Sequence, residues 1–232
     1  MSRGRAIVLA AGILAVAGGC VLQKILLNDL RDAILPDYFS AEAIGLVGDV
    51  PMYQGDIDGY ALSVGDDWGS RFLSALFGYG NERQVLVPFA ADEPRLPWVD
   101  LLVFHEYIHQ CDYSDVLSRE LFIERLAQYR QDPAYADDSA ALDALLESLG
   151  GNGIQEIGYI YDDGLNREAL AYVIEAWVDG CIELPGYMLD VYDGVVLPNP
   201  ALRTDGACSS GFKSIRPHWC AVARAHGLQE PH

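Results

Sequence analysis

The stretch from residue 103 to residue 110, Val-Phe-His-Glu-Tyr-Ile-His-Gln, combines two histidines and a glutamate at a spacing that suits metal chemistry. On a helix, His105 and His109 lie one turn apart on the same face, so both imidazoles can reach one ion. Glu106, beside the first histidine, is placed to take a proton from a water molecule at that ion. Zinc suits this chemistry because it accepts nitrogen and carboxylate ligands and lowers the pKa of a bound water to about 7. The spacing therefore predicts a Zn²⁺ site, with Glu106 as the catalytic general base.

A zinc site built on two histidines needs a third protein ligand and one open position. Asp115 stands where the third histidine of H-E-x-x-H-x-x-G-x-x-H belongs, so that form is excluded. A later segment, residues 166–182, has helical spacing of apolar residues and carries Glu168 and Glu175. These glutamates are seven residues apart and share one face of a helix. Either of them could supply the carboxylate ligand.

Two motifs resemble those of gluzincin-type zinc peptidases. H-E-Y-I-H-Q, followed by the Glu-Ala-Leu-Ala-Tyr that begins at Glu168, is similar to the HExxH motif and downstream Glu-x-x-Ala-aromatic box of many gluzincins. The resemblance covers these two motifs in this order. It implies that His105, His109 and Glu168 hold the zinc, and that an edge strand before the metal helix binds an extended substrate. Glu175 with Asp179 resembles the Glu-x-x-x-Asp of thermolysin-like enzymes, so Glu175 stays an alternative ligand.

The patterns along the chain predict an α+β protein, and the resemblance implies a zincin-like metallopeptidase fold. Residues 84–89 have the composition of a strand closed by a proline, and Pro97 suits the first turn of the metal helix. Apolar spacing then predicts helices at residues 118–130, 139–149 and 166–182. We expect a small mixed region with an edge strand, followed by a mainly helical half, in one domain over residues 41–232.

Residues 1–19 resemble the signal peptide of a bacterial lipoprotein. Two arginines precede an apolar run from residue 6 to residue 17, and Ala-Gly-Gly-Cys ends the segment at Cys20. The resemblance implies export and a lipid anchor on Cys20, which would hold the protein at the periplasmic or extracellular face of the cell envelope. Ordinary cleavage and an uncleaved anchor stay open, because Ala17 departs from the usual lipobox. Residues 20–40 would then form a membrane-proximal tether or helix, since their apolar residues have helical spacing.

The remaining four cysteines, Cys111, Cys181, Cys208 and Cys220, permit two disulfides in an exported chain. We favour the pairs Cys111–Cys181 and Cys208–Cys220, and four free buried thiols are the alternative. Cys111 is not a candidate ligand, because it lies two residues past His109 and so about 200° round the helix.

The formal net charge of −19 argues against nucleic acid and against an anionic membrane surface as partners. The motifs favour zinc-dependent hydrolysis of a peptide or protein substrate. Candidates to stabilise the oxyanion of such a reaction are Tyr159, Tyr161, Tyr172 and His218. A non-catalytic, zinc-stabilised binding or scaffold lipoprotein is the alternative function. A third interpretation places the two histidines, without metal, in a hydrophobic core.

Overall fold

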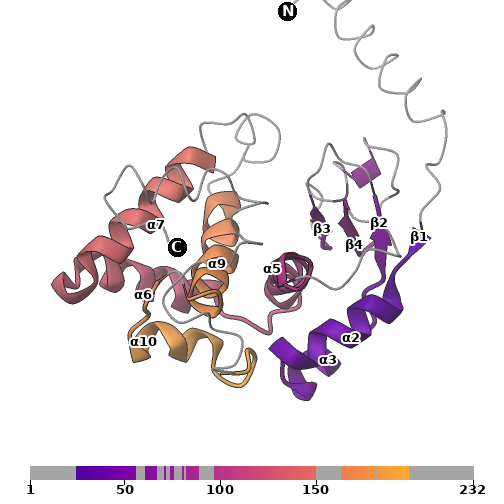
Figure 1. Ribbon diagram of the computed structural model, residues 1–232, viewed down its shortest axis with the longest axis horizontal. Coiled ribbons are helices and arrows are strands. Elements are labelled where there is room, and N and C mark those ends of the chain that lie inside the picture. Colours follow the sequence, from indigo (N-terminus) through magenta and orange to yellow (C-terminus); the bar gives the residue numbers. More distant parts are fainter. Residues whose placement is uncertain are drawn as a thin grey trace, which may run out of the picture.

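The computed structural model describes residues 25–55, 61–66, 71, 74–75, 80, 82–88, 97–149, 163–180 and 182–198. Its main elements are β1 (Ile25–Leu26), α2 (Asn28–Tyr38), α3 (Ala41–Val47), β2 (Met52–Gln54), β3 (Leu62–Val64), β4 (Gln84–Val87), α5 (Pro97–Tyr113), α6 (Arg119–Gln131), α7 (Ala136–Leu149), α9 (Asp163–Val178) and α10 (Gly186–Leu189). The mixed α+β class predicted from the sequence is confirmed, with the strands before α5 and a mainly helical part after it (Figure 1). The predicted signal peptide, Cys20 and the pair Cys208–Cys220 lie outside the described residues.

The four strands of the described residues form one sheet in the order β1-β2-β4-β3. β2 runs parallel to β4, whereas β1 and β3 are antiparallel to their neighbours. The strand predicted before the metal helix is therefore present as β4, but it lies inside the sheet and not at its edge. The reason is that β3 pairs with β4 on the other side, with Ser63 opposite Val85. The edge strand on this side is β3.

Helix α5 lies between the sheet and the helical half, with α9 along its other side (Figure 1). It begins at Pro97, as predicted, because proline suits a first helical turn whose N–H groups lack helical partners. Every residue from 99 to 112 is buried. A helix that is buried on all sides must find partners for its polar side chains inside the protein, and here these include both histidines.

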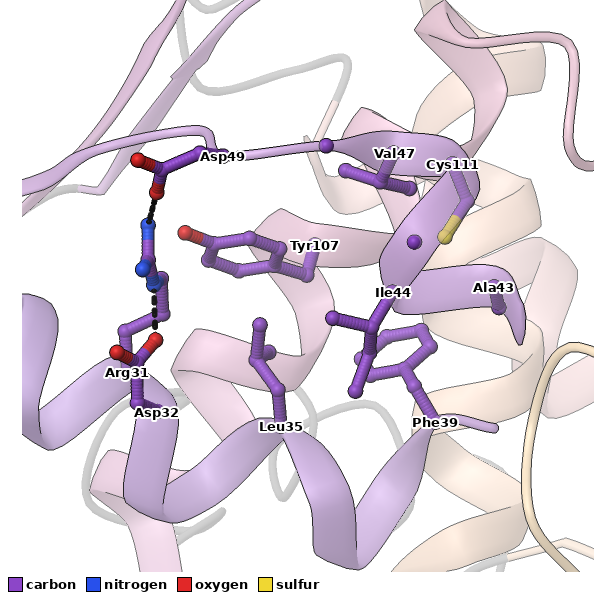
Figure 2. A pocket seen from close by; sticks show the side chains of 12 residues that line it. Arg31, Asp32, Leu35, Phe39, Ala43, Ile44, Val47, Asp49, Tyr107 and Cys111 are labelled. Atoms are coloured by element: carbon purple, nitrogen blue, oxygen red, sulfur yellow. Dashed lines mark hydrogen bonds and ion pairs between the residues drawn. The ribbon is translucent and has the colours of Figure 1, made fainter. Parts of the chain in front are cut away.

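The segment that we assigned to a membrane-proximal tether is part of the folded core from residue 25 onward. β1 pairs with β2, and Ile34, Leu35 and Tyr38 of α2 are buried. Figure 2 shows how α2 joins the loop before β2, where Arg31 contacts Asp49 at 2.7 Å. Because these contacts bind α2 to its neighbours, the folded unit begins well before residue 41.

All three helices predicted after α5 are present, α6 within one residue of its predicted bounds, whereas α7 and α9 begin earlier than predicted, at Ala136 and Asp163. Ser118 caps α6 by accepting a hydrogen bond from the backbone N–H of Leu121, and α6 ends at Gln131, before Asp132. α9 ends at Val178, earlier than predicted, because Gly180 takes a left-handed conformation (φ 75°) that terminates the helix.

Two further observations concern the exported-protein prediction. Cys111 is a free, buried thiol, so the structure does not contain the predicted Cys111–Cys181 disulfide. Burial raises the pKa of the Cys111 thiol from 9.0 to about 12. Among the described residues, no helix combines the length and the apolar character needed to cross a membrane.

Candidate metal centre

The two histidines of α5 point their Nε2 atoms toward one another inside the protein. The distance between the Nε2 atoms of His105 and His109 is 3.2 Å, and the ring planes are inclined by 77°. Both residues are buried, with exposures of 2% and 5%. Helical spacing alone predicts that the rings share a face, and burial of that face directs them into a common polar space.

Glu168 of α9 completes a cluster of three potential metal ligands. Its carboxylate oxygens lie 3.5 Å from Nε2 of His105 and 3.6 Å from Nε2 of His109. One ligand atom from each of these residues falls within 4.8 Å of the others, so the cluster could hold a metal ion. The side chain of Glu168 is 28% exposed, which leaves one side of the cluster open to solvent.

The spacing of the three ligand atoms fits a small tetrahedral ion. Two ligands at about 2.1 Å from a zinc ion, with a tetrahedral angle between them, lie about 3.4 Å apart. The distances between the Nε2 atoms of His105 and His109 and the carboxylate of Glu168 range from 3.2 to 3.6 Å. Two imidazoles and one carboxylate also form a donor set that zinc accepts. The residues present therefore fit the ion that the sequence motif suggests.

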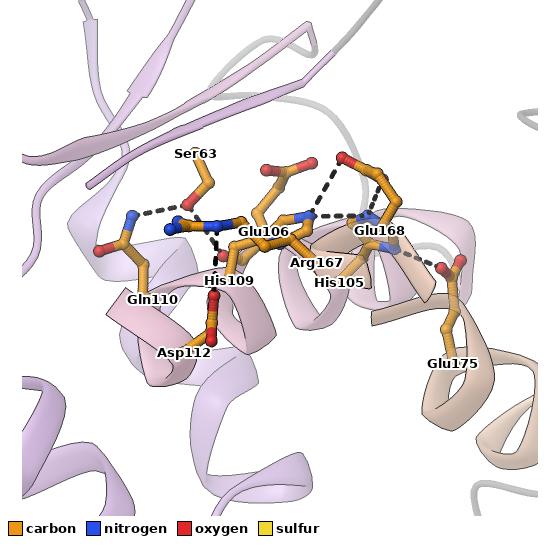
Figure 3. A network of polar contacts seen from close by, with 9 residues as sticks. All are labelled: Ser63, His105, Glu106, His109, Gln110, Asp112, Arg167, Glu168 and Glu175. Carbon is orange, nitrogen blue, oxygen red and sulfur yellow. Dashed lines mark hydrogen bonds and ion pairs between the residues drawn. The ribbon is translucent and has the colours of Figure 1, made fainter. Parts of the chain in front are cut away.

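Glu175, the alternative ligand, contacts the opposite nitrogen of the same histidine. Its Oε2 lies 2.6 Å from Nδ1 of His105, and its side chain is 3% exposed. Burial raises the pKa of Glu175, while its hydrogen bond with His105 opposes that rise. A carboxylate that accepts from Nδ1 holds the ring so that Nε2 faces the cluster, as is common behind metal-bound histidines. In this geometry the carboxylate of Glu175 faces Nδ1 of His105 and lies outside the cluster formed by His105, His109 and Glu168 (Figure 3).

Two residues beside the histidines bear on the chemistry of the site. Glu106 is 6% exposed, and Figure 3 shows its carboxylate on the same side of the histidine pair as that of Glu168. Tyr172 packs against His105, with ring centroids 4.5 Å apart, so the structure gives it a packing contact with a candidate ligand. The other oxyanion candidates (Tyr159, Tyr161 and His218) lie outside the described residues.

An ionic cluster at the end of α5 was not predicted from the sequence. Asp112 accepts two hydrogen bonds from Arg119, at 3.0 and 2.9 Å, and lies 3.7 Å from Nε of Arg167. The guanidinium of Arg167 also stacks 4.6 Å from the ring centroid of Tyr113. Because Arg167 precedes Glu168, these contacts tie the carboxylate ligand to the helix that carries the histidines. No local pattern marks the cluster, since its members are separated in sequence.

Strand β3 is joined to α5 by buried side-chain hydrogen bonds. Gln110 donates to Oγ of Ser63 at 2.6 Å and to the carbonyl of Val64 at 3.2 Å, while Ser63 donates to the carbonyl of Glu106. Arg83 donates to the amide oxygen of Gln110 at 2.7 Å. These bonds fix the edge of the sheet against the turn of α5 that carries Glu106.

A scan against protein-family models and searches of curated proteins and of solved structures find no match for this chain. The function must therefore be argued from the residues and their geometry.

Proposed function

We propose that this protein is a zinc-dependent peptidase with a zincin-like fold, in which His105, His109 and Glu168 hold the metal. The convergence of these three ligand atoms within 4.8 Å is the observation that carries the proposal. Glu106 adds to it, since a carboxylate next to the first ligand histidine has no role in a purely structural zinc site. This is why we favour an enzyme over a zinc-stabilised binding protein.

In the proposed reaction, different residues of this chain would bind the metal, bind the peptide and transfer the proton. Zinc, when bound, supplies a Lewis acid that polarises the scissile carbonyl and makes water acidic enough to be deprotonated near neutral pH. Glu106 takes the proton of the attacking water and passes it to the leaving amine as the peptide bond breaks. Glu175 keeps the ring of His105 oriented throughout. β3, the edge strand next to α5, is the candidate to bind the extended peptide backbone.

The proposal for the cellular location rests on the N-terminal sequence alone. We propose export to the cell envelope with a lipid anchor on Cys20, and a peptide or protein as the substrate. Mass spectrometry of the mature N-terminus tests the first point. A diacylated Cys20 supports the anchor, and an unmodified N-terminus at any other residue contradicts it.

Metal content and hydrolysis test the enzymatic proposal together. The purified full chain should bind one zinc, and its substitution Glu106→Gln should keep the zinc while lowering hydrolysis of a quenched fluorescent peptide library at least about a hundredfold. A matched control is Glu124→Gln, an exposed glutamate on α6. Zinc-free wild-type protein after zinc is supplied, or a Glu106→Gln variant within about tenfold of wild type, would overturn the proposal.

A further inference from the structure

A second site lies on the face of α5 opposite the histidines. At 100° per residue, Tyr107 and Cys111 lie about 200° from His105 and His109 round the helix. Both line a cavity of about 320 Å³ that α2, α3 and α5 enclose (Figure 2). At about 30 Å³ for each water-sized group, the cavity holds a ligand of about ten non-hydrogen atoms. This volume is in the range of small-molecule sites.

The interior of this cavity is apolar and partly aromatic. Its walls include Leu35 of α2, Phe39 directly after α2, Ala43 and Val47 of α3, and the ring of Tyr107. Figure 2 shows Leu35, Ile44 and Tyr107 directed into the space between the helices. The hydroxyl of Tyr107 already donates to the carbonyl of Val50 at 2.7 Å, so its ring presents an apolar surface and not a free donor. A compact apolar or aromatic group suits these walls.

The polar rim of the cavity carries more negative than positive charge. Arg31 directs its guanidinium to Asp32 and Asp49, each at 2.7 Å, and to the carbonyl of Val50. The side chains of Asp32 and Asp49 are 61% and 82% exposed, respectively, so their outer oxygens face the solvent at the rim. An anionic ligand would meet two carboxylates, and Arg31, the one cation among the described lining residues, is already bound to them, whereas a cationic head would be attracted. The net charge of −19 acts in the same direction.

We propose that this cavity binds a small aromatic amine, with the ring between α2, α3 and α5 and the ammonium group at the carboxylates of Asp32 and Asp49. The proposal does not depend on the metal centre, which lies on the other face of α5. Its occupant must be compact, because about ten non-hydrogen atoms fill the space. The chemical class is set by the combination of aromatic walls and an acidic rim.

Three probes with one skeleton and different heads test the proposal on the full chain. Ligand-detected NMR titrations with phenethylamine, 2-phenylethanol and phenylacetate should give binding in that order, with the amine about tenfold tighter than the carboxylate. Equal affinities for the three probes would show an unselective apolar cavity and overturn the amine assignment. The absence of binding by all three would overturn the site itself.

Two variants that fill the cavity locate the binding, and a third variant on α3 serves as the control for both. Ala43→Phe and Gly45→Phe place a ring in or at the cavity, and a Cβ at Gly45 meets no atom within 4 Å, so the second variant keeps the fold if the first does not. Both should weaken phenethylamine binding at least about tenfold. Glu42→Phe, at an exposed position of α3 that does not line the cavity, should leave phenethylamine binding unchanged. Unchanged binding in both filling variants would overturn the site.

A charge variant tests the role of the rim. Asp49→Asn should weaken phenethylamine binding about threefold and leave the binding of 2-phenylethanol unchanged. A threefold loss is the size expected for a solvent-exposed charge pair. Asp29→Asn removes the same charge from an exposed position of α2 that does not line the cavity, and should leave the binding of both probes unchanged. Equal losses in the two variants would show a long-range charge effect and remove the reason for an ammonium head at the rim.

Discussion

The two faces of α5 are buried to the same extent and serve different ends. On the face toward α9, His105 and His109 meet the carboxylates of two glutamates, at distances between 2.6 and 3.6 Å. On the face toward α2 and α3, Tyr107 and Cys111 border a largely apolar cavity. Burial makes unpartnered polar groups costly, so the chemistry of each face is set by what the neighbouring helix offers. The difference shows that the surroundings of the polar side chains on such a helix depend on the elements packed against each face.

The contrast between the two faces of α5 is tested most directly by removing Glu168, the proposed metal ligand on α9. On the proposal that His105, His109 and Glu168 hold zinc, Glu168→Ala should weaken zinc binding by about a hundred- to thousandfold, because it removes one of the three proposed ligands. Competition with a zinc chelator measures the change, and circular dichroism checks the fold. Unchanged zinc affinity would show that the metal is held elsewhere.

A substitution on the other face should change stability without touching the metal site. Leu35→Ala removes a side chain that is 6% exposed between α2 and α5, and should lower the free energy of unfolding by about 2–4 kcal/mol. Urea unfolding measures the change in the free energy of unfolding. The zinc affinity of the folded variant should stay within about twofold of the wild-type value. Leu46→Ala, at a position that is 64% exposed, serves as the control and should cost less than about 0.5 kcal/mol. A large loss of zinc affinity in Leu35→Ala would show that the two faces are coupled.

A variant of Glu175 distinguishes two proposed roles for this residue. It either orients the ring of His105 or binds the metal directly. Glu175→Gln keeps the size and a hydrogen-bonding oxygen but loses the charge, and should weaken zinc binding about ten- to a hundredfold. The same chelator competition measures it. A loss as large as that of Glu168→Ala would instead make Glu175 a direct ligand.

The smallest effect concerns the pH dependence contributed by Cys111. Burial raises its pKa from 9.0 to about 12, so the folded protein favours the neutral thiol and the unfolded chain ionises first. This stabilisation is complete below pH 9 and is lost as the pH rises from 9 toward 12, by up to about 1.4 kcal/mol per pH unit. Urea unfolding at pH 8 and pH 10 should therefore show a smaller loss of stability in Cys111→Ala than in wild type. Equal losses in both proteins would contradict a buried thiol at this position.

Several elements were predictable because their determinants are local. Pro97 sets the start of α5, Ser118 caps α6, and apolar spacing marks α7 and α9. The four-residue spacing of His105 and His109 predicts one shared helix face, and no other part of the chain is needed for that inference.

Other features were decided by pairing and packing between distant segments. β4 was predicted as a strand, but only its pairing with β3 places it inside the sheet. The helix expected within residues 20–40 is present as α2, but apolar spacing shows only that a helix has a buried face and not which elements cover it. The predicted Cys111–Cys181 disulfide failed for a similar reason, since connectivity depends on three-dimensional proximity.

The sequence by itself determined the types of the candidate ligands, the spacing of the two histidines on α5 and the mixed α+β class. Only the tertiary structure distinguished Glu168 from Glu175, because both lie on one helix face and satisfy the same spacing. The packing of α9 against α5 directs Glu168 toward the Nε2 atoms and Glu175 toward Nδ1 of His105. Which nitrogen a carboxylate meets depends on the relative position of two helices whose contacting residues, such as His105 and Glu175, are 70 residues apart in the sequence, and that position is set by long-range packing.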